Sequence, residues 1–395
     1  MPRSERVRPW LALLGLILGV CVTNGFARFA YGLLLPAMQA DLGWSYAQAG
    51  WLNTANALGY IGGALLTMVL IRRAGPARLF AFGMVTTAVA LTAPGQDPAL
   101  GWQTLWRVLA GFFGAMSFAT AGALAAQLFR DDPRRNALAI ALLFGAGGGI
   151  GIVLAGAVLP LLLDRLGPAA WPMAWTLIGL VCFAFLPLGR WSAHVLRPAR
   201  LARAPEPQPL PIRQMLPQIG GYAGFGLGYI VYLTFLSAWM TELGASAELI
   251  ALVWVLLGLC LCLSPFLWRP VLARFATGLP LALILVGVAT GSLLPVLWPG
   301  GLGLVVSAAV FGLCVFMAPG AVTSFLRQNL PPDSWGPGLS LFTVVFAVAQ
   351  TLGPFGAGLI GDLAQNIGVS LAVAAAVLLC GAGSALLQRR LVTPD

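Results

Sequence analysis

Twelve long apolar stretches limit this chain to one class of fold. Most are about 20 residues long, the length of helix that crosses the ~30 Å hydrocarbon core of a bilayer. Hydrophobic residues make up 59% of the 395 residues and charged residues only 9%, whereas soluble domains have about 45–50% and about 25%. Such a chain has too little polar surface for water. The sequence therefore predicts an all-α integral membrane protein that lies in the lipid bilayer.

The expected helices fall into two sets of six. Residues 1–189 are predicted to form an N-terminal bundle and residues 217–395 a C-terminal bundle. The stretch between them, 190–216, is rich in proline and arginine, which is typical of a solvated cytoplasmic linker. The helices are expected at 10–35, 47–71, 79–95, 102–128, 137–162 and 171–189, and then at 217–240, 248–268, 279–298, 302–326, 338–361 and 368–388.

Arginine is unevenly distributed between the loops that join these helices. All 22 basic residues are arginine, and 19 of them fall in the terminal segments and loops of one side, whereas only Arg165 falls in a loop of the other side. Positive loops stay in the cytoplasm, so both termini are predicted to be cytoplasmic, in a multi-pass protein of the bacterial cell inner membrane. Orientation also explains the net charge of +10 without a nucleic-acid partner.

The two halves of the chain repeat one another. The segment "MQADLGWSYAQAG", after the first helix, is echoed by "WMTELGASAELIA", after the seventh. Asp41 then corresponds to Glu242, and Ser45 to Ser246. A parallel six-helix repeat is a known architecture of secondary transporters.

Three stretches resemble motifs of one transporter superfamily. In "RVLAGFFGA" (107–115) small residues follow an arginine at four-residue spacing, and "IRRAGPAR" (71–78) lies where that superfamily carries a loop motif, with Arg72 in place of its usual aspartate. Residues 27–60 look like the first hairpin of the YbfB/YjiJ-type branch. The chain thus resembles the major facilitator superfamily. This resemblance implies two pseudo-symmetric bundles, a monomer, and a substrate site between the halves near mid-membrane.

Two arginines lie inside expected spans, where a charge is costly. Arg28 lies about seven residues before the outer end of the first helix and Arg107 about five residues into the fourth, so at 1.5 Å per residue both are expected roughly 8–11 Å deep. All 12 acidic residues map to loops or helix ends. The sequence therefore predicts that the anion is the substrate, because guanidinium groups suit carboxylate or phosphate.

The sequence also allows a structural role for each arginine. Arg107 can bond carbonyl groups of the first helix, as its counterpart in the superfamily motif often does. Arg28 can reach outward to Asp41 or Asp97 as part of a gate.

Other polar and aromatic residues are predicted to line the same substrate site. Asn24, Arg28 and Tyr31 are spaced to share one face of the first helix, and Asn53, Asn56 and Tyr60 one face of the second. In the second half, Tyr222, Phe225, Tyr229 and Tyr232 are spaced as one stripe. The predicted substrate-binding residues are Arg28, Arg107, Asn24, Tyr31, Asn53, Asn56, Tyr229, Tyr232 and Gln350.

The sequence favours a secondary or facilitative transporter of a small organic anion that works by alternating access. The alternative is an exporter of neutral or amphiphilic drugs or metabolites, with the two arginines structural or gating. An enzyme is not expected, because His194 is the only histidine, and no nucleophile motif, metal-ligand spacing or cofactor motif is present. Protons are a candidate partner besides the small-molecule substrate, with Asp41, Asp362 and Glu242 as peripheral proton sites.

Overall fold

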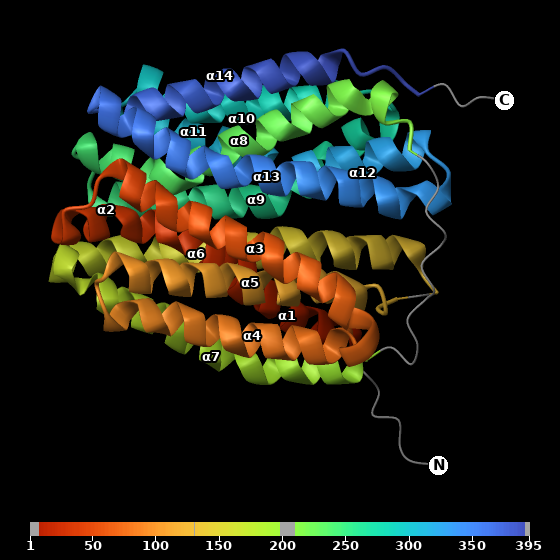
Figure 1. Cartoon of the computed structure of the whole chain (residues 1–395), viewed down its shortest axis with the longest axis horizontal. Helices are drawn as coiled ribbons and strands as arrows, with labels where there is room; N and C mark the ends of the chain where they lie inside the picture. The colour runs from red at the N-terminus through yellow and green to blue at the C-terminus, as the bar shows by residue number, and fades with distance from the viewer. Residues whose placement is uncertain (1–7, 130, 198–209, 392–395) are drawn as a thin grey trace. The chain divides into compact units, whose positions relative to one another are not determined.

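The computed structural model describes residues 8–129, 131–197 and 210–391, and in these residues every regular element is a helix (Figure 1). Within this part of the chain, 12 helical stretches are long and apolar enough to cross a membrane. They confirm the all-α class and the predicted number of spans. The expectations for Arg3, Arg6 and the centre of the linker fall outside the described residues.

The first six spans are built from ten elements, because short 3₁₀ and π segments interrupt or extend them. These elements are α1 (Pro9–Val20), the π-helix η1 (Cys21–Ala30), α2 (Tyr31–Leu42), α3 (Tyr46–Ala74), α4 (Pro76–Thr92), the 3₁₀-helix η2 (Ala93–Gln96), α5 (Leu100–Ala125), α6 (Pro133–Leu166), the 3₁₀-helix η3 (Pro168–Ala170) and α7 (Trp171–Val195).

The second six spans contain only α-helices. They are α8 (Ile212–Glu242), α9 (Ala247–Arg274), α10 (Leu279–Leu297), α11 (Gly301–Val315), α12 (Ala318–Asn329), α13 (Pro332–Ala364) and α14 (Ile367–Leu386). Because α7 ends at Val195 and α8 begins at Ile212, helix occupies both ends of the expected linker.

The chain divides into two compact units. Unit 1 comprises Met1–Leu42 and Ala55–Ala202, and unit 2 comprises Gly43–Thr54 and Arg203–Asp395. The first turns of α3 therefore pack with unit 2, and the rest of that helix with unit 1. The predicted boundary of the two bundles at 190–216 stays a prediction.

Each unit has its own helical core. In unit 1, α4 packs on α5 and α7, while η1 packs on α5 and α6. In unit 2, α8 lies beside α13 and α14 in Figure 1, and α10 packs on α11 and α14. Glycine permits a close approach of η1 to α6 in unit 1, since a Cβ added to Gly25 of η1 would lie 2.7 Å from the Cα of Gly151 on α6.

Proline explains two differences from the expected spans. The first span runs to Leu42 and not to residue 35, because Pro36 is accommodated inside α2; neighbouring helices make proline tolerable in a membrane span. The tenth span is broken into α11 and α12, where one helix was expected at 302–326. The break precedes Pro319, which has no N–H to donate to the carbonyl of Val315.

Candidate functional site

Arg28 lies in the π-helix η1, in the interior of the first span. Eight of the ten residues of η1 are buried, and the two that are partly accessible are Asn24 and Arg28. The centre of the Arg28 guanidinium lies 5.3 Å from the ring of Tyr60 on α3 and 5.8 Å from that of Phe29. The π-helix thus presents an amide and a cation at its two accessible positions. π-helical turns within α-helices are frequent at functional sites.

Arg107, on α5, is fully enclosed, with an exposed fraction of 1%. Its Nη1 donates a hydrogen bond of 2.7 Å to the carbonyl oxygen of Ala27, and its guanidinium lies 4.7 Å from the ring of Tyr31. Both partners belong to the first span, so the structure contains the carbonyl interaction that the sequence left open as an alternative. The bond also places the Arg107 guanidinium at the level of Arg28, the residue next to Ala27.

Asn56 connects three elements of unit 1. Its Nδ2 donates to the carbonyl oxygens of Arg107 at 3.0 Å and of Ala27 at 3.4 Å. The backbones of α3 and α5 approach closely here, since a Cβ at Gly111 would lie 1.9 Å from the carbonyl oxygen of Asn56. The Asn56 amide therefore joins α3 and α5 to η1 at Ala27, the residue directly before Arg28.

The two carboxylates proposed as gate partners of Arg28 have other contacts. Asp41 Oδ2 accepts from the indole Nε1 of Trp171 at 2.8 Å, and Asp97 Oδ1 accepts from the backbone N–H of Ala99 at 2.8 Å. These bonds give each carboxylate a partner other than Arg28.

Unit 2 contains a stack of aromatic rings on α8 and α13. The ring of Phe225 lies 4.6 Å from that of Tyr229 with 16° between their planes, and Phe346 lies 5.6 Å from Tyr229 at 26°. Tyr222 joins the same stack, 5.4 Å from Phe346. The Tyr229 hydroxyl donates to Gln350 Oε1 at 3.1 Å. The structure thus brings together two predicted site residues, Tyr229 and Gln350.

Tyr232 does not continue this stack, contrary to the expected stripe. Its ring lies 3.9 Å from Phe311, and its hydroxyl is 2.8 Å from Ser307 Oγ, both on α11. The reason is geometric: ten residues of an α-helix turn through about 1000°, so Tyr232 lies roughly 80° around α8 from Tyr222.

Asn53 and Asn56 also separate, although they are three residues apart on α3. Asn53 Nδ2 donates to Thr234 Oγ1 on α8 at 2.5 Å, whereas Asn56 bonds within unit 1. The difference follows the division of α3 between the units, which lies between Thr54 and Ala55.

Comparison with known proteins identifies the family. The model of the family described as "Uncharacterised MFS-type transporter YbfB", where MFS is the major facilitator superfamily, matches residues 20–386. The chain belongs to this family. Members of this family are transporters and not enzymes, as the sequence predicted.

Two curated relatives match part of the transporter. A "Putative metabolite transport protein" of Haemophilus influenzae is 31% identical over 161 residues, which cover 40% of this chain and 38% of that protein. The "Puromycin resistance protein pur8" of Streptomyces alboniger is 33% identical over 134 residues, 33% of this chain and 26% of that protein. The chain thus spans about two fifths of the first relative's length and about a quarter of the second's.

Two solved structures share the fold. A bacterial homolog to the human lysosomal transporter Spinster, in an inward-facing and occupied conformation, has a TM-score of 0.70 at 16% identity and covers 98% of this chain and 97% of its own. A mutant of the nucleoside transporter NupG has a TM-score of 0.69 at 14% identity, covering 95% and 97%. These likenesses confirm the major facilitator fold.

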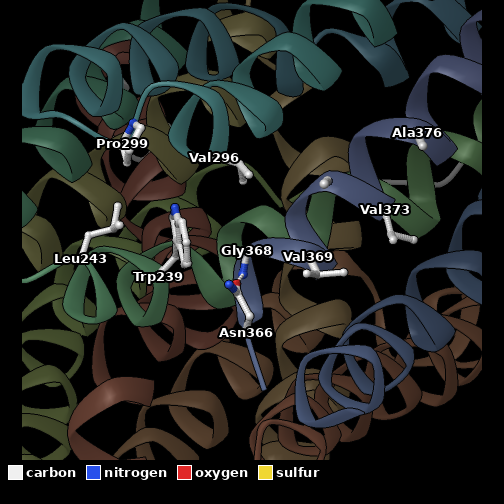
Figure 2. Close-up of a pocket in the computed structure, with 10 residues that line it drawn as sticks. Trp239, Leu243, Val296, Pro299, Asn366, Gly368, Val369, Val373 and Ala376 are labelled. Atoms are coloured by element: carbon white, nitrogen blue, oxygen red, sulfur yellow. Dashed lines mark hydrogen bonds between the residues drawn. The ribbon is translucent and has the colours of Figure 1, made fainter. Parts of the chain in front are cut away.

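A groove of about 620 Å³ lies on unit 2 of the transporter (Figure 2). Its described lining includes none of the predicted site residues. Its walls come from the ends of α8 and α10 and from the start of α14, and its lining is almost wholly apolar. Trp239, the largest lining side chain, donates its indole N–H to the carbonyl of Pro295 at 3.0 Å. The described lining has no charged side chain, and Asn366 supplies its polar side chain.

One acceptor of the site, a backbone carbonyl group, was not predicted from the sequence. The carbonyl oxygen of Ala27 accepts from both Arg107 and Asn56, and a backbone acceptor leaves no residue-type signal. The close approach of α3 and α5 did leave a signal in the sequence. Gly59 and Gly63 are four residues apart, and both face the backbone of α5.

Proposed function

We propose that this chain is a secondary or facilitative transporter that moves a small organic anion, such as a carboxylate, across the inner membrane by alternating access. Arg28 and Asn24 bind the anionic group. Arg107, Asn56 and Tyr31 hold η1 in the conformation that presents them, while Tyr229 and Gln350 form a polar edge of the aromatic stack in unit 2.

The accessibility pattern of η1 is the observation that carries this proposal. In a segment whose other eight residues are buried, the accessible side chains are one amide and one guanidinium. A charged residue inside a span normally faces a polar cavity or pathway, because lipid solvates it poorly. A guanidinium there favours an anionic ligand, and the neighbouring amide can donate a second hydrogen bond to it.

Arg107 strengthens the positive potential at this level of unit 1. Its bond to Ala27 positions a second guanidinium next to the residue that precedes Arg28. Two positive charges in a low-dielectric setting raise the local concentration of an anion more than one does. Arg107 is itself enclosed, so its effect is exerted through the field and through the position of η1.

The second candidate is an exporter of neutral or amphiphilic compounds. Two observations favour it: the stack of Tyr222, Phe225, Tyr229 and Phe346, in which Phe346 is partly accessible, and the similarity to a puromycin resistance protein. In that case Arg28 and Arg107 serve structure or gating.

Ligand-induced thermal stabilisation of the purified protein distinguishes the two functions. A panel of mono- and dicarboxylates, neutral aromatic compounds and organic cations is added to wild type, Arg28→Gln and Arg165→Gln. Arg165 is exposed at the end of α6. Arg165→Gln is therefore a control that loses one arginine away from the proposed site. We expect carboxylates to stabilise wild type and Arg165→Gln. Arg28→Gln should bind them about 10- to 100-fold more weakly, as for a lost charge-assisted hydrogen bond.

Uptake into proteoliposomes then tests transport of the stabilising compound. Stabilisation of wild type and Arg28→Gln to the same degree by neutral or cationic compounds, with no response to carboxylates, would refute the anion proposal and support the exporter.

A further inference from the structure

The first turns of α3 are held on unit 2 by contacts of several kinds. We call residues 43–54, which group with unit 2, the strap. Within it, Asn53 donates to Thr234 on α8, and Thr54 Oγ1 donates to the carbonyl of Thr351 on α13 at 2.7 Å. From Ala55 onward the same helix belongs to unit 1.

The backbones of the strap and α13 touch at two glycines. A Cβ at Gly50 would lie 2.2 Å from the carbonyl oxygen of Pro354, and a Cβ at Gly358 would lie 2.3 Å from the carbonyl oxygen of Tyr46. The two glycines therefore let the backbones of the strap and α13 pack closely. These contacts carry no charge, so pH does not change them.

Asp362 of α13 supplies the charged contact of the strap. Its Oδ1 accepts from the backbone N–H of Tyr46 at 2.7 Å, and its Oδ2 accepts from that of Ala47 at 2.9 Å. These N–H groups belong to the first turn of α3, which has no intrahelical acceptors and carries the positive end of the helix dipole. The carboxylate thus uses both oxygens on one helix end.

This double acceptance is strongest with the ionised carboxylate. When a proton from solvent adds to one oxygen, that oxygen becomes a hydroxyl, which is a weaker acceptor from a backbone N–H. Both hydrogen bonds lose their charge assistance, and the attraction between the negative charge and the helix end disappears. Asp362 is only partly buried, so solvent protons can reach it.

The other titratable groups around the strap are Tyr46 and Glu242. The Tyr46 hydroxyl donates to Glu242 Oε1 at the end of α8, and both carboxylates interact electrostatically with Tyr46. On the α14 side, Ile367 and Ser370 lie against Gly361, next to Asp362, and neither titrates. Glu242 holds a side chain, whereas Asp362 holds the backbone of the helix end.

We propose that protonation controls how the strap is bound. Ionised Asp362 holds residues 43–54 against the rest of unit 2, and protonation of Asp362 releases them. The proposal rests on the chain being a transporter that must change conformation, and it is independent of which substrate is carried. It makes Asp362 the place where a proton acts on the conformational cycle.

Backbone hydrogen–deuterium exchange of a peptide that covers the strap tests this directly. Exchange, corrected for its intrinsic pH dependence, is followed in the full-length protein while the pH is lowered from about 7 to about 2.5, a range that extends below the ordinary pKa of aspartate, about 3.9. We expect strap exchange in wild type to become roughly tenfold faster, as for the loss of one charge-assisted bond. In Asp362→Asn, exchange should be fast throughout, without a pH transition.

Two further variants sharpen the result. Glu248→Gln removes an exposed carboxylate from the first turn of α9, and should exchange like wild type. Glu242→Gln should keep the pH transition, because Asp362 and its two backbone donors remain. The proposal is overturned if wild type shows no pH transition in the strap, a result that does not depend on any variant folding, or if Asp362→Asn exchanges as slowly as wild type. Neither outcome involves substrate, so the proposed anion transport stands or fails separately.

Discussion

The guanidinium of Arg107 donates to the carbonyl oxygen of Ala27, 2.7 Å away, the residue directly before Arg28. One arginine therefore supports the backbone that presents the other. This relationship separates their roles: Arg107 is enclosed and acts on η1, while Arg28 is accessible and is the one proposed to meet the substrate.

Arg107→Lys tests the supporting role. Lysine keeps the buried charge but loses the planar group that lies beside Tyr31 and bonds Ala27, so we expect a loss of about 1–2 kcal/mol of stability. Thermal unfolding in detergent measures it. Arg165→Lys, at an exposed position of unit 1, should leave the melting temperature unchanged, and equal effects of both substitutions would argue against the support.

Gly111→Ala tests the close approach of α3 and α5. The added methyl group would overlap the carbonyl oxygen of Asn56, and overpacking of this kind costs about 1–3 kcal/mol. Gly101→Ala is the control on the same helix, since a Cβ there meets nothing within 4 Å. A lower melting temperature is expected for Gly111→Ala alone; similar melting of both variants would contradict the contact.

Asn53→Ala and Asn56→Ala are predicted to loosen different parts of the chain. Asn56→Ala removes the bonds to Arg107 and Ala27, so hydrogen exchange should rise in η1 and the start of α5. Asn53→Ala removes the bond to Thr234, so exchange should rise in α8. Each variant is the control of the other, and the same exchange pattern in both would show that the separation is wrong.

Tyr229→Phe and Tyr232→Phe separate a proposed ligand contact from a core contact. Tyr232→Phe loses only its bond to Ser307, and should cost about 1 kcal/mol with ligand-induced stabilisation unchanged. Tyr229→Phe frees the Gln350 oxygen and should alter that stabilisation. If ligand responses change in Tyr232→Phe and not in Tyr229→Phe, the assignment of the two tyrosines is reversed.

Reporter fusions test the predicted orientation. A fluorescent protein at the C-terminus should fold in the cytoplasm, and alkaline phosphatase fused after Trp298, between α10 and α11, should be active outside it. Fusion after Thr277, between α9 and α10, is the inactive control. Phosphatase activity at Thr277 and none at Trp298 would invert the topology.

The number of spans was predictable because about 20 apolar residues are needed for each crossing. The described residues contain 12 helical stretches of that kind. The depth of Arg28 was not predictable from the helix end. The first helix was expected to end at residue 35, yet α2 continues to Leu42. The shared level of the two arginines is instead shown by the bond from Arg107 to Ala27.

The π-helix was also not predicted from the sequence, nor were the different hydrogen-bond partners of Asn53 and Asn56. In an apolar run, residue types do not distinguish i→i+5 from i→i+4 bonding, because both bury almost every side chain. The partners of the two asparagines depend on where α3 passes from one unit to the other, and that is a property of packing rather than of spacing.

The π-helix also has a consequence for register. Its wider turn changes the angular phase between the helix that precedes it and the helix that follows it. In unit 1, α1 packs on α6 and α7, while α2 packs on η3 and α6. Ten π-helical residues let α1 and α2 each keep these neighbours, while Asn24 and Arg28 are rotated to the accessible side. Deleting one residue from η1 is expected to shift that phase and move Arg28 away from the accessible side.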